Sequence, residues 1–350
     1  MPVLLITSAG GAGGKTALAS ALALRLAQHG QSVALARPAV LDGANPSRVA
    51  ADLAFYAQVA PQSPRISGLP VTLPGSPSSD GSRPWRDLLA PALSANVTLL
   101  EGLDLQGEQA AQTVQRQAEA LDAKVVIVAR YRADLDVEQL ARYVAPFRRR
   151  VLGVLLNQVP RHRAVHASEE LAAALHRAGL PVLGIVPEDR RMAAPTLRQV
   201  AEMLNGEFLL LPEKADHLVE SLMVGGWFLD EGRYVFSQRQ RKAVLVRGDR
   251  PDLQMAALET DTVGLILTDG KEPVQYTVYH AELQGVPLVK TSLGTVAAME
   301  RLQGLHAKST VHHPQKAQRF LELLDAAGAT DKLLAGLGIA PAQATGARNA

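Results

Sequence analysis

At 350 residues, the chain is too long for one typical domain and suits two. Its 36 Lys and Arg residues nearly balance 34 Asp and Glu residues, so the net charge of +2 gives no electrostatic reason to expect nucleic acid or an anionic membrane as a partner. The absence of cysteine excludes disulfides, thiolate metal sites and cysteine nucleophiles.

The start of the chain predicts a strand, a glycine-rich loop and a helix. Residues 3–7 form a short apolar run with β-branched members, and the glycine-rich segment 10–14 follows it. Leu18 and Leu22 mark the apolar face of a helix that ends near Gly30. This order opens a parallel α/β sheet. The apolar run is too short to span a membrane and lacks the basic residues of a signal peptide, so we expect a cytoplasmic protein.

Further apolar runs continue this pattern. Buried strands are predicted at 32–36, 97–100, 124–129, 151–156 and 181–186. Helical patterns separate most of them, and crossover helices between apolar strands imply a parallel sheet covered on both faces. The segment 58–84 is rich in Pro, Ser and Gly, which predicts a long surface loop.

A second, smaller α/β unit follows a connector. Its strands are predicted at 243–246, 263–267 and 287–289, and two further helices are expected within 315–336. The predicted organisation is a nucleotide-binding domain at 1–206, a connector at 207–241, a smaller α/β domain at 242–336 and a flexible tail at 337–350.

The glycine-rich loop carries the strongest chemical signal. Glycine lets consecutive backbone N–H groups converge on phosphate oxygens at a helix N-terminus, and these groups would come from Gly10, Gly11, Ala12, Gly13 and Gly14. Lys15 would reach the β- and γ-phosphates, and the Thr16 hydroxyl would ligate Mg²⁺. Position 9 lacks the first glycine of the GxxxxGK[ST] pattern, so a glycine-rich turn that binds nothing is the alternative. Its place directly after the first strand favours nucleotide binding and a P-loop NTPase-type parallel sheet with helices on both faces.

Glu101 follows the predicted strand 97–100 directly. A carboxylate at the carboxyl end of a strand beside the phosphate loop lies where the metal ion must be. The alternative is an acid that is merely solvated at a strand end.

The loop and three further motifs resemble those of dethiobiotin synthetase. That family also has an extra residue before its Gly-Lys-Thr, and its leading glycine falls on Ser8. The resemblance implies that Arg37, in Arg37-Pro38, replaces a lysine that contacts phosphate and substrate, and that the carboxylate of Glu101, in Glu101-Gly102, sits beside Mg²⁺. It also implies a second metal-site aspartate at Asp52, for which Asp42 competes.

The same resemblance implies a role for Asn157, which follows the predicted strand 151–156. In the synthetase an asparagine reads the nucleotide base, since an amide can both donate to and accept from a purine edge. The alternative is an ordinary Asn that caps a loop. The charged segment 187–191 either borders the base or ribose or forms a solvated cluster at a helix start.

Beyond the first domain, the chain resembles the N-terminal half of long bacterial phosphotransacetylases, in which a dethiobiotin-synthetase-like domain precedes a DRTGG domain. The motifs are Gly-Ile-Val-Pro-Glu-Asp-Arg-Arg at 184–191, Gly-Asp-Arg at 248–250 and Leu-Thr-Asp-Gly at 267–270. This half is non-catalytic, so no acetyl transfer is expected of it. A ligand site in the second domain would use Asp249, Arg250, Thr268, Asp269 and Gly270. These residues could equally be turn signals. His312 and His313 are expected at the surface.

Together these features predict an ATP- and Mg²⁺-binding regulatory or sensor ATPase, with Lys15 and Arg37 as its catalytic residues. Its second domain would read a metabolite or contact a partner enzyme, and related P-loop domains imply a homo-oligomer. The alternative is an ATP-dependent ligase of the dethiobiotin-synthetase type, which forms a carboxyl- or carbamoyl-phosphate intermediate. A ligase should release phosphate only when its organic substrate is present.

Overall fold

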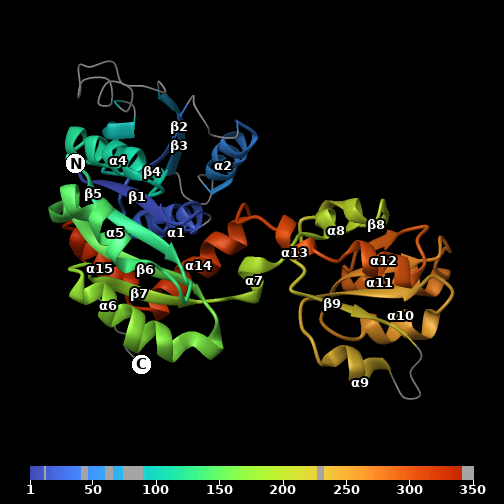
Figure 1. The fold of residues 1–350 in the computed structure, drawn as a ribbon. Helices are drawn as coiled ribbons and strands as arrows, with labels where there is room; N and C mark the ends of the chain where they lie inside the picture. Colours follow the sequence, from blue (N-terminus) through green and yellow to red (C-terminus); the bar gives the residue numbers. More distant parts are fainter. Residues whose placement is uncertain are drawn as a thin grey trace, which may run out of the picture. The chain divides into compact units, whose positions relative to one another are not determined.

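The computed structural model describes residues 1–11, 13–40, 46–59, 66–73, 90, 92–226 and 232–340. Ala12, Asp42 and the tail beyond 340 therefore lie outside the described residues. The chain divides into two compact units: unit 1 is formed by Met1–Asp189 and the chain from Val311 onward, and unit 2 by Arg190–Thr310 (Figure 1).

Unit 1 is built on a parallel sheet with the strand order β3-β2-β4-β1-β5-β6-β7 in the described part of the chain. Every pairing in it is parallel. The chain leaves the central strand β1 toward β2 first and reaches β5 later, so the carboxyl edge beside β1 is a topological switch point. The strands are β1 (Val3–Ala9), β2 (Val33–Val40), β3 (Ile66–Leu73), β4 (Val97–Asp104), β5 (Lys124–Arg130), β6 (Val151–Val159) and β7 (Val182–Pro187).

The prediction of a continuous surface loop at 58–84 is wrong for part of this segment. Residues 66–73 form the edge strand β3, which pairs with β2 along its whole length. A glycine and a proline inside this segment hid the strand pattern, and an edge strand tolerates both.

Helices cover both faces of this sheet. Apolar side chains of α4, α5 and α6 share a core with β1, β4, β5 and β6. The crossover through α1 runs along the sheet toward β3, whereas those through α4, α5 and α6 run toward β7. Because right-handed crossovers of opposite direction lie on opposite faces, α1 covers the other face. Helix α1 ends at Gln28, and Gly30 has a left-handed φ of 78°, as the sequence predicts. The helices are α1 (Lys15–Gln28), α2 (Pro46–Val59), α4 (Glu108–Ala120), α5 (Val137–Val144), α6 (Ala172–Arg177), α14 (Pro314–Ala326) and α15 (Ala329–Gly336), with short 3-10 or π turns at Ala92–Ser94, Ala145–Arg150, Arg161–Arg163 and His166–Leu171.

The last two helices correct the expected domain boundary, because α14 and α15 belong to unit 1 rather than to the second domain. Helix α14 packs along α1, and α15 packs on β6 and β7 (Figure 1). Small residues allow this approach: a Cβ on Gly184 of β7 would lie 2.9 Å from the Ala329 methyl group. Arg319 of α14 also donates two hydrogen bonds, of 2.8 and 3.0 Å, to Asp189 Oδ2.

Lys316 of α14 is expected to make stability depend on pH. The residue is 2% exposed, and burial lowers the pKa of its amine from 10.5 to about 8. Between these values the unfolded chain binds more protons than the folded chain, so stability rises with pH by about 3 kcal/mol. Lys316→Met should reduce the rise by about this amount, and denaturant unfolding across that range measures it. The exposed Lys124 is the control: Lys124→Met should leave the rise in place. A rise in Lys316→Met as large as that of the wild type would contradict this prediction.

Unit 2 contains a smaller sheet with the strand order β8-β12-β11-β10-β9. All its pairings are parallel except that between β12 and β8. One helical layer packs against Leu245 and Ile266, and the other against Val244 and Leu265. The elements are α7 (Arg190–Ala193), α8 (Leu197–Met203), β8 (Glu207–Leu210), a 3-10 turn (Pro212–Lys214), β9 (Ser221–Val224), α9 (Gly232–Ser237), β10 (Lys242–Arg247), α10 (Pro251–Leu258), β11 (Thr262–Thr268), α11 (Gln275–Gln284), β12 (Leu288–Lys290), α12 (Thr295–Arg301) and α13 (Leu305–Lys308).

The prediction that 207–241 is a connector is also wrong, because this segment supplies both edge strands of the sheet, β8 and β9. The unit therefore begins at Arg190, well before the predicted boundary at 206. Within the described residues, no helix combines the length and the apolar character that crossing a membrane requires.

Candidate functional site

The predicted phosphate loop lies between β1 and α1 and depends on glycine geometry. Gly10 and Gly14 have φ values of 67° and 103°, which favour glycine. Gly13 approaches strand β5 so closely that a Cβ on it would lie 2.7 Å from the Val128 carbonyl oxygen. Gly14 also leaves α1 without a side-chain cap, so the first-turn N–H groups of this 14-residue helix stay available to an anion.

Asn157, at the end of β6, lies beneath this loop. Its Nδ2 donates a 2.8 Å hydrogen bond to the Gly13 carbonyl, and its Oδ1 accepts a 2.9 Å bond from the Gln158 amide. The residue is 3% exposed. The amide thus braces the loop from inside the protein, and the base-reading role of Asn157 stays a prediction.

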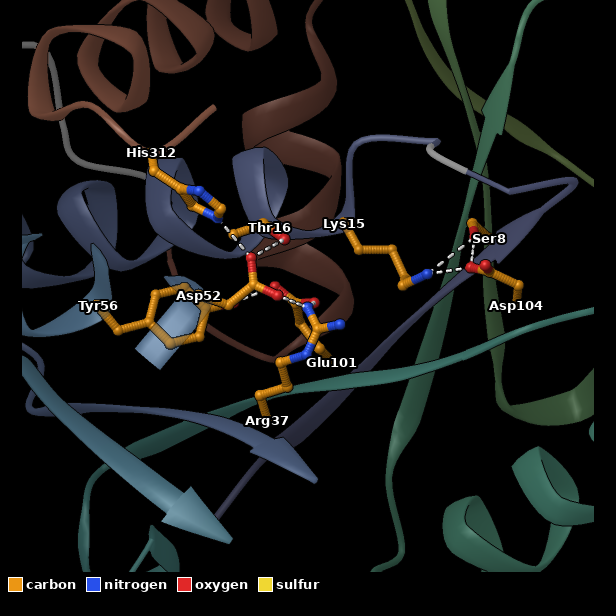
Figure 2. A network of polar contacts seen from close by, with 9 residues as sticks. All are labelled: Ser8, Lys15, Thr16, Arg37, Asp52, Tyr56, Glu101, Asp104 and His312. Atoms are coloured by element: carbon orange, nitrogen blue, oxygen red, sulfur yellow. Dashed lines mark hydrogen bonds and ion pairs between the residues drawn. The ribbon is translucent and has the colours of Figure 1, made fainter. Parts of the chain in front are cut away.

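Lys15, the first residue of α1, turns toward β4 (Figure 2). Its Nζ donates to Ser8 Oγ at 3.1 Å and forms an ion pair with Asp104. A β-bulge explains why Asp104 is available: Ile6 pairs with Glu101, but Ser8 pairs with Asp104. Residues three apart normally point to opposite faces, and the extra residue brings both acids to one face. Sequence spacing alone therefore could not assign Asp104 to the site.

A buried ionic network lies beside the loop, between β2, α2 and β4 (Figure 2). Arg37 pairs with Asp52 and also donates a 2.9 Å hydrogen bond to Glu101 Oε2. Tyr56 donates its hydroxyl to the other oxygen of Glu101. Both carboxylate side chains are only 2% exposed. The structure thus brings together three predicted site residues, and it adds Tyr56, which sits one helical turn from Asp52.

Burial sets the protonation of this network. It raises the pKa of Glu101, and the Asp52 charge adds to the effect while Arg37 opposes it. Burial also raises the pKa of Tyr56 well above its ordinary value, and the Glu101 charge raises it further. Tyr56 therefore remains a hydrogen-bond donor to Glu101.

The oxygens around Thr16 fit a Mg²⁺ ion that arrives with a nucleotide. Thr16 Oγ1 lies 3.5 Å from Asp52 Oδ1, and Glu101 shares Arg37 with Asp52. Hydroxyl and carboxylate oxygens are the donors that Mg²⁺ takes, usually with phosphates and water completing its shell. Among the described residues, no group of three or more His, Asp and Glu side chains could hold a metal ion by itself.

His312, which the sequence places at the surface, is part of the site instead (Figure 2). Its Nε2 lies 2.5 Å from Asp52 Oδ1, and its ring lies 5.4 Å from that of Phe55. It follows unit 2 in the chain, so no local pattern near the phosphate loop signals it.

The predicted residues of unit 2 gather at the carboxyl ends of β10 and β11. Arg247 binds Asp249 through two hydrogen bonds of 2.7 and 3.0 Å, and it lies 3.6 Å from Asp269. The hydrogen bonds from Arg247 lower the pKa of Asp249. Thr268 Oγ1 is 2.8 Å from Thr295 Oγ1, and Gly270 forms part of the same turn with a φ of 65°.

Two features separate this edge from an open anion cradle. Arg250, predicted in the ligand site, turns to Asp252 with hydrogen bonds of 2.7 and 2.9 Å. The amides of Asp269 and Gly270 donate to the carbonyls of Leu293 and Thr291. A ligand at this edge would therefore contact the loop side chains and not these two amides.

Comparison with known proteins supports the two-part organisation. The family model of an AAA domain matches residues 3–196, and that of the DRTGG domain matches residues 199–305. Phosphate acetyltransferase of Acinetobacter baylyi is 24% identical over 269 residues, which cover 65% of this chain and 37% of that protein. The aligned region is thus little more than a third of the relative. These matches confirm the expected resemblance to the N-terminal half of phosphotransacetylases.

Two solved structures are also similar. The MinD cell division protein of Aquifex aeolicus has a TM-score of 0.39 and 16% identity, covering 55% of this chain and 84% of that one. The CBS and DRTGG domains of the Clostridium perfringens pyrophosphatase regulatory region, complexed with diadenosine tetraphosphate, have a TM-score of 0.29 and 18% identity, covering 33% of this chain and 50% of that one.

Proposed function

The chain belongs to the family of this AAA domain, a P-loop NTPase-like domain followed here by a DRTGG domain, and we propose that it is a cytoplasmic ATP- and Mg²⁺-binding protein that works as a slow regulatory or sensor ATPase. One observation carries the proposal. The glycine loop that ends in Lys15 and Thr16 shares one sheet edge with the buried carboxylates Asp52 and Glu101.

The proposed roles follow from this geometry. Backbone N–H groups of Gly10 to Gly14, Ala12 included, and the first turn of α1 receive the phosphates. Lys15 exchanges its partner Asp104 for the β- and γ-phosphates. Thr16, Asp52 and Glu101 hold Mg²⁺, which supplies the charge that stabilises the transferring phosphoryl group.

Arg37 supplies the second positive charge. In the structure it neutralises Asp52 and Glu101, whose joint charge would otherwise be buried without compensation. With these carboxylates engaged by a bound metal ion, the Arg37 guanidinium would be free to reach a phosphate, for which its fork of donors is suited.

A ligase of the dethiobiotin-synthetase type is the second candidate. It is favoured by the position of Arg37, where the resembled enzyme has its phosphate- and substrate-contacting lysine. The γ-phosphate would pass to a carboxylate or carbamate oxygen, giving ADP and a mixed anhydride. An amine would then attack the anhydride carbon and release phosphate.

Unit 2 is proposed to read a metabolite, or to contact a partner enzyme, through Asp249, Thr268, Asp269 and Gly270. The support is their common position at the carboxyl edge of a parallel sheet, where α/β folds bind ligands. Arg250 would join them only by leaving Asp252. The proposal includes a homo-oligomer, by resemblance to related P-loop domains.

Release of inorganic phosphate from MgATP tests the function. We expect turnover below about 1 s⁻¹ without any organic substrate, because no acceptor is needed for slow hydrolysis. Release that begins only when carboxylates or amines with bicarbonate are added would favour the ligase. If the chain at millimolar MgATP shows no nucleotide binding and no phosphate release, both the ATPase and the ligase are refuted.

A further inference from the structure

His312 makes a buried contact that the proposed roles above do not use. Its Nε2 lies 2.5 Å from Asp52 Oδ1, and the histidine side chain is 20% exposed. A carboxylate only accepts hydrogen bonds from such a partner, so the ring nitrogen is the donor. The same Oδ1 lies 3.5 Å from Thr16 Oγ1, while Oδ2 pairs with Arg37 (Figure 2).

The start of α14 fixes this histidine. His313 is the N-cap of the helix, where its ring accepts a 3.2 Å hydrogen bond from the Gln315 amide, and Pro314 is the first helical residue. The helix packs along α1, which carries Thr16. The Phe55 ring, 5.4 Å from that of His312, lies on the neighbouring α2. His312 is therefore held toward Asp52 by elements that also carry the candidate metal ligands.

We propose that His312 is a positioning residue of the Mg²⁺ site, which it serves by holding the Asp52 carboxylate beside Thr16. This inference rests on the proposed nucleotide-binding function. Each carboxylate oxygen has two acceptor positions, so Oδ1 can accept from His312 and still contribute to an ion. Partners that orient a ligating carboxylate typically contribute 10- to 100-fold to metal affinity, about as much as we assign to His312.

The residues that orient Asp52 come from both ends of the chain. Unit 2 ends at Thr310, and His312 follows two residues later. The Asp52 carboxylate is therefore oriented by Arg37 from the beginning of the chain and by His312 from the segment that follows the DRTGG domain. The metal site is complete only when both parts of unit 1 are in place.

Binding of a fluorescent ATP analogue, titrated with Mg²⁺, tests the proposal in the full chain. We expect His312→Ala to raise the Mg²⁺ concentration at half-saturation about tenfold or more. Affinity for the analogue in EDTA should change less than about twofold, because His312 touches Asp52 and not the phosphate loop. His312→Gln can still donate to Asp52 and should recover much of the loss.

His313→Ala is the matched control: it weakens the cap that helps to fix His312 but keeps the donor to Asp52, so it should lose less Mg²⁺ affinity than His312→Ala. An unchanged Mg²⁺ half-saturation in His312→Ala would overturn the proposal. Equal losses in His313→Ala, or an equal loss of affinity in EDTA, would also overturn it by showing a structural effect. If the wild-type chain shows no Mg²⁺-dependent binding at all, the proposed function itself fails, a result distinct from the others.

Discussion

Arg37→Ala should lower the free energy of unfolding of unit 1 by about 3–5 kcal/mol, since it leaves two buried carboxylates without their shared cation. Burial already raises the pKa of Glu101 with Arg37 present, and the variant should raise it further. The folded variant then binds more protons than the unfolded chain, so its stability falls as pH rises. The loss should be larger at pH 8 than at pH 5, as denaturant unfolding would show.

The effect of Mg²⁺ on the stability of Arg37→Ala tests whether these carboxylates bind the ion. If Asp52 and Glu101 hold the ion, millimolar Mg²⁺ should restore more stability to Arg37→Ala than it adds to the wild type. Arg198, which is half-exposed and pairs with Asp216, is the matched control, and Arg198→Ala should cost less than about 1 kcal/mol. A loss in Arg37→Ala no larger than that of the control would mean that the two carboxylates do not depend on Arg37.

Lys15→Ala should weaken MgATP binding at least about 100-fold, or about 2.7 kcal/mol. The lysine is the side chain that the loop geometry directs to the β- and γ-phosphates. The fold should survive, because its partner Asp104 is 32% exposed and can be hydrated when the lysine is gone. Calorimetric titration measures the affinity, and thermal unfolding checks the fold.

Lys124→Ala is the control for this second prediction. Lys124 is exposed at the amino end of β5, whereas the phosphate loop lies at the carboxyl edge of the same sheet. It should bind MgATP as the wild type does. Equal binding by Lys15→Ala and Lys124→Ala would exclude the loop as the nucleotide site.

Local features of the fold were predictable because their causes are local. The apolar run of β1, the glycine turn and the periodicity of α1 occupy one continuous segment, and the structure forms all three there. Glu101 was predictable for a similar reason, since a buried run ends at it. Asp52 was found by resemblance to a family, and the structure places it beside Arg37.

Other parts of the site depend on tertiary structure. Asp104 faces Lys15 because of a bulge that the alternation of β4 does not reveal. His312 reaches Asp52 across 260 positions of sequence, after the chain has passed through unit 2. The edge strands β8 and β9 have four residues each and are only partly buried, so no strong apolar run marked them. The hydrogen bond from Asn157 to the Gly13 carbonyl joins residues 144 positions apart, so the sequence pattern did not predict it.

Calorimetric titration of the wild-type chain with ATP, with and without Mg²⁺, tests the central claim most directly. We expect saturable binding of one nucleotide per chain that strengthens when Mg²⁺ is present, because Thr16, Asp52 and Glu101 then bind the ion. No binding heat at millimolar ATP with Mg²⁺, confirmed by a second method, would contradict it. The glycine loop would then be a structural turn beside a buried ion network.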